Sequence, residues 1–293
     1  MTIAQFGDVF LYAPLYIAKD LGFFKNRGYN VDFVGGGDEK TWAAVASRNA
    51  QFGVADPTFI AISGEKGLRG TVVASIIAKA PFWGIAFDNK IPKIVKPSDL
   101  NGFSVATFPS PSTAYTLQKQ MFLDGGLKPN IREGSFGSLI ALVKAKRSDI
   151  ALEIEPNVSQ AIQTGASVLY GLDTIYGDFQ TTGITVLPSL IKENPKMVEG
   201  IVCSVADALA FLRSNPDQSV NILIRRFPEI DRNVAKSSLE RMTASNVIPF
   251  NPKVNEASWN NAIKLRKKAG DLPSGGLYSA YVNNSFTENC NNK

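Results

Sequence analysis

The 293-residue chain has no histidine, two cysteines and no run of about 18 apolar residues that could form a membrane helix. The lack of histidine excludes Ser-His-Asp and Cys-His nucleophilic machinery and removes the commonest general base. Two distant cysteines without histidine also exclude zinc sites of the usual kind. An enzyme built from this chain would have to work with carboxylates, Lys or Tyr. We therefore expect no catalytic residues, no metal and no cofactor.

The two cysteines and the chain ends give further expectations. Cys203 falls on an apparent buried helix face and Cys290 in a polar tail, so no structural disulfide is expected. The Asn-rich tail from Asn283 onward is expected to be poorly ordered. Met1 directly precedes a predicted strand, which argues against a signal peptide. The chain would then be either cytosolic or the mature part of an exported protein.

The composition is 44% hydrophobic and 19% charged, as in soluble globular proteins, and the length suggests two domains of ordinary size. The formal net charge is +5, but Lys and Arg are scattered rather than gathered in a run. A solvated surface is therefore the better interpretation, and no nucleic-acid partner is expected.

Strands and helices alternate along the first part of the chain. The predicted strands are Thr2–Phe6, Val31–Val34, Phe52–Ala55 and Thr71–Ile77, with apolar helical periodicity between them. This β-α-β order with short loops predicts a mostly parallel sheet covered by helices, an α/β fold. The residues at the strand ends should gather on one edge, where such sheets bind ligands.

Three loops at that edge carry candidate ligand contacts. Phe10 and Tyr12 follow the first strand and would either stack on a ligand or pack under the next helix. Asp56-Pro57-Thr58 has the pattern of a helix start, with Asp56 as the cap, and Thr58 could also face a ligand. The run Gly35–Gly37 lacks the spacing of a phosphate-binding fingerprint and is interpreted as a tight turn.

A second alternation begins at Phe103. Its predicted strands are 103–107, 149–153 and 167–170, and the extended apolar runs Trp83–Phe87 and Thr182–Leu187 bracket it as hinge strands would. We therefore predict a first lobe from residues 1–87, a second from 88–182 and a return to the first from 183–293. Beyond Pro188 the pattern is helical, and these helices should pack on the first lobe and carry no chemistry.

The stretch Gly102–Thr113 is the strongest candidate binding element. A short strand leads into Pro, Ser and Thr residues that open a predicted helix, Ala114–Leu123. Such a helix end has unpaired N–H groups and a positive dipole pole, which suit a ligand's acceptor atoms, and the hydroxyls of Ser110, Ser112 and Thr113 would add donors. Alternatively, Ser112 only caps the helix.

Seven phrases in this order resemble the nitrate/sulfonate/taurine and thiamine-pyrimidine family of ABC-transporter solute-binding proteins. They are Pro14–Lys19, Gly22–Phe24, Gly35–Gly37, Phe52–Asp56, Pro97–Gly102, Glu155-Pro156 and Val282–Phe286. The resemblance implies a type II periplasmic-binding-protein fold, in which two α/β lobes with mostly parallel sheets are joined by two hinge segments. It further implies a small-molecule ligand in the cleft, an ABC-transporter permease as partner, a monomer, and a periplasmic or extracellular membrane-associated location.

A ligand can drive closure only by touching both lobes, so both should contribute to the site. The candidates are Phe10, Tyr12, Asp56, Pro57, Thr58 and Trp83 from the first lobe and hinge, and Ser110, Ser112, Thr113 and Glu155 from the second. The aromatic residues would stack on the ligand, and Glu155, with Glu153 as second choice, would bind an amine. Alternatively, Glu155 is a surface or capping residue before Pro156.

The ligand class stays open at this point. Aromatic loops with a glutamate favour an aminopyrimidine or aromatic compound, whereas the Ser-Pro-Ser-Thr turn favours a sulfonate or carboxylate. An enzyme on the same fold is the alternative function, either pyrimidine-synthase-like or menaquinone-pathway-lyase-like. Fungal pyrimidine synthases resemble this family but use a histidine and a cysteine-rich motif that are missing here.

Overall fold

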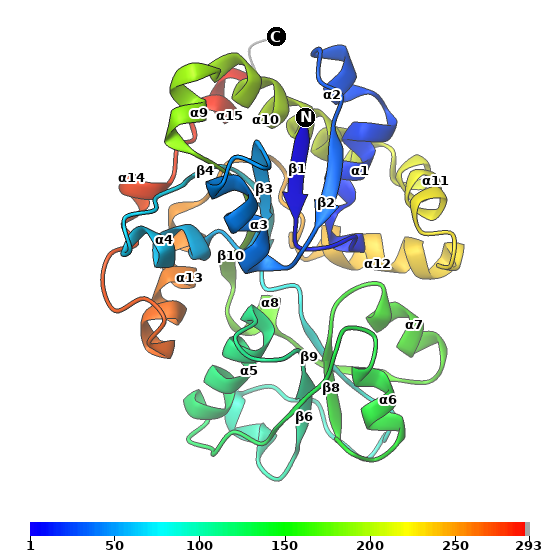
Figure 1. The fold of residues 1–293 in the computed structure, drawn as a ribbon. Helices are drawn as coiled ribbons and strands as arrows, with labels where there is room; N and C mark the ends of the chain where they lie inside the picture. Colours follow the sequence, from blue (N-terminus) through cyan, green and yellow to red (C-terminus); the bar gives the residue numbers. More distant parts are fainter. Residues whose placement is uncertain (291–293) are drawn as a thin grey trace.

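The computed structural model describes residues 1–290 and shows two α/β lobes, one above the other in Figure 1. The blue part and the yellow-green-to-red part of the chain form the upper lobe, and the cyan-to-green part between them forms most of the lower one. Residues 291–293, which end the predicted return segment 183–293, lie outside the described residues. The α/β, two-lobe class predicted from the alternating pattern is confirmed.

The sheet of the first lobe has the strand order β2-β1-β3-β10-β4. Its strands are β1 (Thr2–Gln5), β2 (Asp32–Gly35), β3 (Phe52–Ala55), β4 (Thr71–Lys79) and β10 (Asp178–Val186). The strand β1 pairs in parallel with β2 and β3, whereas β10 runs antiparallel between β3 and β4. Four strands therefore share one direction. The strand that opposes them is the one that returns from the second lobe.

The second sheet repeats this plan with the order β7-β6-β8-β5-β9. Its strands are β5 (Trp83–Ala86), β6 (Val105–Thr107), β7 (Ile131–Glu133), β8 (Ile150–Glu153) and β9 (Ser167–Gly171). Here β5 is the antiparallel strand, between β8 and β9, and it is the first strand after the chain leaves the first lobe. Each sheet thus contains one antiparallel strand, β10 in the first lobe and β5 in the second. In both sheets it is the first strand after the chain enters from the other lobe.

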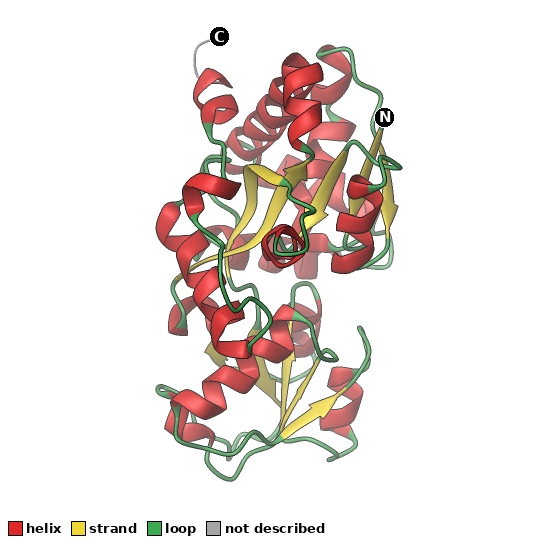
Figure 2. Ribbon diagram, turned by 60° about the vertical axis from the view of Figure 1, so that its left-hand side comes forward, coloured by secondary structure: helices red, strands yellow, loops and turns green. Residues whose placement is uncertain are grey.

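Helices cover both sheets (Figure 2). Up to β10 they are η1 (Phe10–Tyr12), α1 (Ala13–Asp20), α2 (Phe23–Asn26), α3 (Asp38–Ala46), α4 (Thr58–Gly64), η2 (Pro97–Leu100), α5 (Thr113–Asp124), α6 (Leu139–Lys144), α7 (Asn157–Gln163) and α8 (Leu172–Ile175). After β10 they are α9 (Pro188–Glu193), α10 (Pro195–Ser214), α11 (Pro216–Arg226), α12 (Arg232–Ala244), α13 (Glu256–Ala269), α14 (Tyr278–Tyr281) and α15 (Ser285–Asn289).

The predicted lobe boundaries need correction at both crossings. The strand Trp83–Ala86 pairs with β8 and β9, so it lies in the second sheet and not in the first lobe. Conversely, residues 178–182 belong to β10 and pair with β4, although they were assigned to the second lobe. Trp83–Ala86 is a buried apolar run, which does not indicate which sheet it joins, and residues 178–182 are mainly polar, so their place in β10 was not recognised. The sheets place the crossings at residues 80–82 and 172–177.

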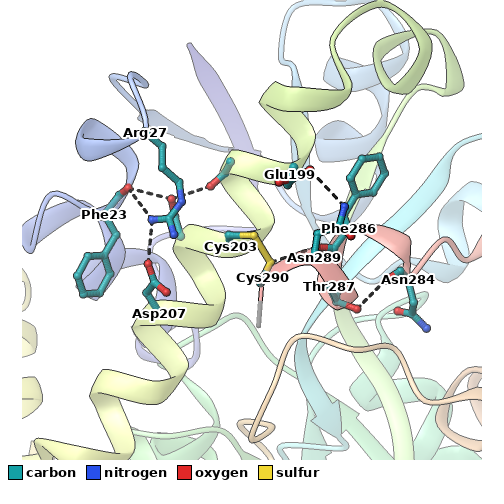
Figure 3. The surroundings of a disulfide bond; sticks show 12 residues. Phe23, Arg27, Glu199, Cys203, Asp207, Asn284, Phe286, Thr287, Asn289 and Cys290 are labelled. Atoms are coloured by element: carbon teal, nitrogen blue, oxygen red, sulfur yellow. Dashed lines mark hydrogen bonds and ion pairs between the residues drawn. A yellow bond between two sulfur atoms is a disulfide. The ribbon is translucent and has the colours of Figure 1, made fainter. Parts of the chain in front are cut away.

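The two cysteines form a disulfide, contrary to the expectation from sequence (Figure 3). Cys203 lies on α10 and Cys290 directly follows α15, and these helices pack side by side with the two Cα atoms 5.0 Å apart. The tail was expected to be disordered from Asn283, but Phe286 is buried and residues 285–289 are helical. The tail is mostly polar, and Phe286 is the one aromatic residue that α15 buries, so the sequence pattern did not indicate that this helix packs on the lobe.

Within residues 1–290, no helix combines the length and apolar content needed to cross a membrane.

Candidate functional site

A cavity of about 240 Å³ lies between the two lobes. Its first-lobe wall contains the ends of β1, β2 and β3, represented by Phe6, Asp38 and Asp56. Its second-lobe wall contains residues that follow β6 and β8, namely Phe108 and Ile154. The carboxyl ends of the parallel strands of both sheets therefore face the same space. This is the edge at which open α/β sheets place their ligands.

Aromatic side chains form much of the cavity wall. Phe82 enters from the crossing between β4 and β5, and Tyr12 from the 3-10 turn after β1. Phe108 and Phe136 form a tilted pair with ring centroids 6.0 Å apart, and Phe136 is 54% exposed. Phe6, on the opposite lobe, is 40% exposed. Exposed aromatic rings that also line a cavity provide stacking surface for a planar ligand.

Asp56 joins the two lobes at the cavity wall. Its Oδ1 accepts hydrogen bonds from the backbone N–H of Thr58 (2.8 Å) and from the Thr58 hydroxyl (2.6 Å). Its Oδ2 accepts from the hydroxyl of Thr113 in the second lobe (2.6 Å) and from the guanidinium of Arg266 (2.7 Å). Asp56 was expected to be the cap of α4, but Pro57 occupies the cap position and Asp56 lies one residue earlier, where it still accepts the first N–H of the helix. The bond to Thr113 gives Asp56 a second role as an interlobe contact.

Arg266 of α13 is almost fully buried behind Asp56, and its donors are engaged on all sides. Besides Asp56 and Thr58, its guanidinium donates to Asp271 (3.1 Å) and to the Thr113 hydroxyl (3.2 Å). It also reaches the carbonyl of Pro111 at 3.5 Å. The helices after Pro188 were expected to pack on the first lobe, and Arg266 shows that α13 also contacts the second lobe. Its positive charge is shared by two carboxylates and does not line the cavity.

Asp38 is the second carboxylate on the cavity wall. It occupies the first position of α3, directly after the glycine run, where Gly37 has a φ of 82° and makes the expected tight turn. Its Oδ1 accepts the backbone N–H of Asp56 at 3.0 Å. Burial, together with the nearby Asp56 carboxylate, raises the pKa of Asp38 to about 7, although the Asp56 N–H and Arg266 oppose the shift. The sequence interpretation covered the glycines but not this aspartate.

The start of α5 lies at the cavity, as predicted. Ser112, Thr113 and Ala114 all line the cavity, and they open α5. The Ser112 hydroxyl accepts the N–H of Tyr115 at 3.2 Å, so the capping interpretation of this serine is confirmed. The first N–H groups of a helix have no intrahelical acceptor. The backbone of this turn is therefore the part that can donate to a ligand.

Four of the ten sequence candidates line the cavity, and six do not. Tyr12, Asp56, Ser112 and Thr113 line it. Phe10 is buried against Phe227, and Pro57 and Thr58 are buried at the start of α4. Trp83 is buried in β5, and Ser110 is exposed with its N–H bonded to Glu133. Glu155 is completely buried.

Glu155 holds the lobes together on another side of the interface. Its carboxylate accepts the N–H and hydroxyl of Ser159 on α7, both at 3.0 Å. From α12 it accepts the Ser238 hydroxyl at 3.0 Å and Arg241 Nε at 2.6 Å. The carboxylate thus has its donors within the protein, and neither Glu155 nor the second choice, Glu153, lines the cavity. A donor partner was correctly expected for this buried glutamate, but it is a protein side chain.

The remaining lining residues were not identified from sequence. They are Phe6, Val9, Leu11, Asp38, Pro81, Phe82, Phe108, Pro109, Ala114, Phe136, Ile154, Thr181 and Thr182. Position at the end of a predicted strand, for Phe6, or directly after one, for Phe108 and Ile154, was the signal that would have found these residues. Phe136 follows β7, a three-residue exposed edge strand with the sequence Ile-Arg-Glu that has no buried pattern to detect. Within residues 1–290, no cluster of three or more His, Cys, Asp or Glu side chains could hold a metal ion.

Comparison with known proteins places the chain in a family. The sequence model described as "NMT1/THI5 like" matches residues 10–219, which is well over half of the chain. The chain belongs to the NMT1/THI5-like family. The resemblance found in the sequence phrases is thereby confirmed.

Relatives of this NMT1/THI5-like protein are named as binding proteins. The putative binding protein YtlA of Bacillus subtilis is 22% identical, with 98% of this chain and 89% of that protein covered. The riboflavin-binding protein RibY of Chloroflexus aurantiacus is also 22% identical, with 88% and 72% covered. The crystal structure of the periplasmic aliphatic sulphonate binding protein SsuA from Escherichia coli superimposes with a TM-score of 0.77 at 18% identity, covering 97% and 92%. This likeness confirms the type II periplasmic-binding-protein fold.

Proposed function

We propose that the protein is the solute-binding receptor of an ABC importer. It captures a small molecule between its lobes, closes around it and presents the closed form to a membrane permease. The observation that carries this proposal is the cavity itself, because its lining comes from both lobes and from the carboxyl ends of both sheets. A ligand there contacts both halves at once, so its binding free energy favours the closed arrangement over the open one.

The polar groups around the cavity support the same proposal. Thr113 of the second lobe bonds to Asp56 of the first, and both line the cavity. Closing the lobes therefore assembles the hydrogen bonds and the ligand-binding wall together. We propose Tyr12, Asp56, Ser112 and Thr113 as direct ligand contacts, with Phe6, Phe108 and Phe136 as stacking partners. The other six sequence candidates stabilise the walls behind the cavity or lie outside it.

We propose that the protein works as a monomer outside the cytoplasm, at the periplasmic or extracellular face of a membrane, and performs no chemistry on its ligand. The Cys203–Cys290 disulfide supports this location, because such bonds persist in oxidising compartments. The sulphonate-binding neighbour is named as periplasmic, and both curated relatives are named as binding proteins.

A thermal-shift screen of the purified chain tests the receptor function. The panel contains alkanesulfonates, taurine, nitrate, pyrimidines, riboflavin and aromatic acids. A ligand at a hundredfold its dissociation constant raises the unfolding free energy by about 2.7 kcal/mol, which is readily measured. The ligand should also be recovered unchanged, and its addition should reduce the radius of gyration in small-angle scattering. Conversion of the ligand, or stabilisation with no change in scattering, contradicts the proposal.

A further inference from the structure

The charges at the cavity are of one sign. Two carboxylates, Asp38 and Asp56, line it, and among residues 1–290 no Lys or Arg side chain does. Asp56 is balanced by Arg266 and is bonded to Thr58 and Thr113. Arg266 has no donor left for a ligand because its contacts are all within the protein. An anionic ligand would therefore enter a site with surplus negative charge and find no cation to pair with.

The carboxylate of Asp38 accepts fewer hydrogen bonds from the protein than that of Asp56. Within the described part of the chain it forms no salt bridge, and its hydrogen bond from Asp56 N–H engages Oδ1. Its other carboxylate oxygen is left for a donor outside the protein, since the side chain forms part of the cavity wall. A carboxylate removed from water needs such a donor to offset the loss of hydration. The aromatic walls around it favour a planar partner.

We propose that Asp38 determines which solute binds. The site takes an aromatic ring that carries an amine, amidine or ring N–H donor, with the donor bonded to the Asp38 carboxylate, and it rejects sulfonates, carboxylates and nitrate. This inference deepens the proposed receptor function and depends on it. It sets the chain apart from its structural neighbour that is named for binding aliphatic sulphonates. The cavity of about 240 Å³ suits one ring or a small fused ring system better than a long flexible chain.

The surroundings of Asp38 make its charge sensitive to pH. Burial, and after it the charges of Asp56 and Glu39, disfavour the ionised form of Asp38, whereas the Asp56 N–H and Arg266 favour it, and the Tyr12 hydroxyl lies in the same region. With a pKa of about 7, Asp38 ionises fully only above neutral pH. A cationic ring should therefore bind more weakly as the pH falls from 8 to 6, with a loss of affinity of about tenfold over that range. A donor that binds elsewhere would not show this profile.

Three probes of the same ring and size test the inference by calorimetry. Benzamidine presents a cationic donor, benzamide a neutral donor and benzoate an anionic acceptor, and benzenesulfonate and nitrate are added as oxyanions. The expected order is benzamidine, then benzamide, then benzoate, with the oxyanions weakest. Tighter binding of benzoate, benzenesulfonate or nitrate than of benzamidine overturns the inference.

Asp38→Asn is the decisive variant, because Asn keeps an acceptor for the Asp56 N–H and removes the charge. Glu39→Gln is its matched control, since Glu39 is the next residue on α3, is exposed and does not line the cavity. Benzamidine affinity should fall by about 10- to 100-fold in Asp38→Asn and stay within about twofold in Glu39→Gln. Equal losses in the two variants, or no loss in either, overturn the assignment to Asp38.

Small-angle scattering of the same samples separates this inference from the receptor function. If nitrate or a sulfonate closes the lobes and no donor-bearing ring does, the receptor function stands and the inference about Asp38 is wrong. If no probe of either class binds or closes the lobes, both are contradicted. Closure by benzamidine that is lost in Asp38→Asn supports both.

Discussion

Breaking the buried ion pair between Glu155 and Arg241 should destabilise the protein and loosen the contact between its lobes. The carboxylate is completely buried, and the Arg241 side chain is 29% exposed. The pair joins α7, in the second lobe, to α12, which packs through α11 on the first. In Figure 1, α12 lies at the lower border of the upper lobe, facing α7. Arg241→Ala removes the cation and leaves the anion in place.

The expected loss of stability depends on the hydrogen bonds that Glu155 retains in the Arg241→Ala variant. Removing one partner of a buried ion pair costs about 3–5 kcal/mol, because the other charge stays buried without compensation. Here the carboxylate retains three hydrogen bonds, two from Ser159 and one from Ser238, so we expect the lower end, about 3 kcal/mol. The same variant should raise the radius of gyration of the unliganded protein, since one of its interlobe contacts is lost.

Urea unfolding at neutral pH measures the effect, and Arg225→Ala provides the matched control. Arg225 pairs with Asp20 at 2.7 Å, but the two side chains are 60% and 39% exposed. Exposed pairs contribute about 0–1 kcal/mol, so this control should change stability little. Our reasoning is refuted if Arg241→Ala and Arg225→Ala differ by less than about 1 kcal/mol, because burial would then not decide the cost.

Three further predictions test other parts of the fold. Gly84→Ala should cost about 1–3 kcal/mol in urea unfolding, since a Cβ at Gly84 would lie 2.1 Å from the Tyr170 ring. Reducing Cys203–Cys290, which closes a separation of 87 residues, should lower stability by about 2–4 kcal/mol in a melt with and without reductant. Burial raises the pKa of Glu153 to about 7, so its stabilising contribution is complete below about pH 4.5 and is lost as the pH rises through 7; Glu153→Gln should flatten stability measured across that range.

The strands of the parallel core could be predicted because they form short, mainly apolar runs. Phe52–Ala55 and Ile150–Glu153 are buried at every position, and such runs bounded by turn residues are typical of strands covered on both faces. The same property made β5 ambiguous. Trp83–Ala86 is equally buried, but its sheet is decided by pairing with β8 and β9, which are more than 60 residues away in sequence. Pairing partners of that separation leave no local signal.

Only part of the site could be predicted, because some of its residues are brought together by packing between distant segments. Residues in the loops that follow predicted strands, such as Asp56 and Thr113, could be placed at the cleft by the rule for α/β sheets. Arg266 and Arg241 could not, because a charged residue in a helix after Pro188 is most often solvated. Only packing between elements far apart in sequence brings these guanidinium groups to their partners: α12 packs on α7 and places Arg241 beside Glu155, and α13 packs on β10 and α4 and places Arg266 beside Asp56.

The carboxylates at the lobe interface differ in the groups that donate hydrogen bonds to them. Glu155 and Asp56 each have an arginine and at least one hydroxyl from the protein, so their negative charge is already used to hold the lobes together. Asp38 has a backbone N–H and no arginine within salt-bridge distance in residues 1–290. Because closure and recognition then depend on different carboxylates, a change at Asp38 should alter which solute binds without abolishing closure. A change at Glu155 should weaken closure for every solute alike.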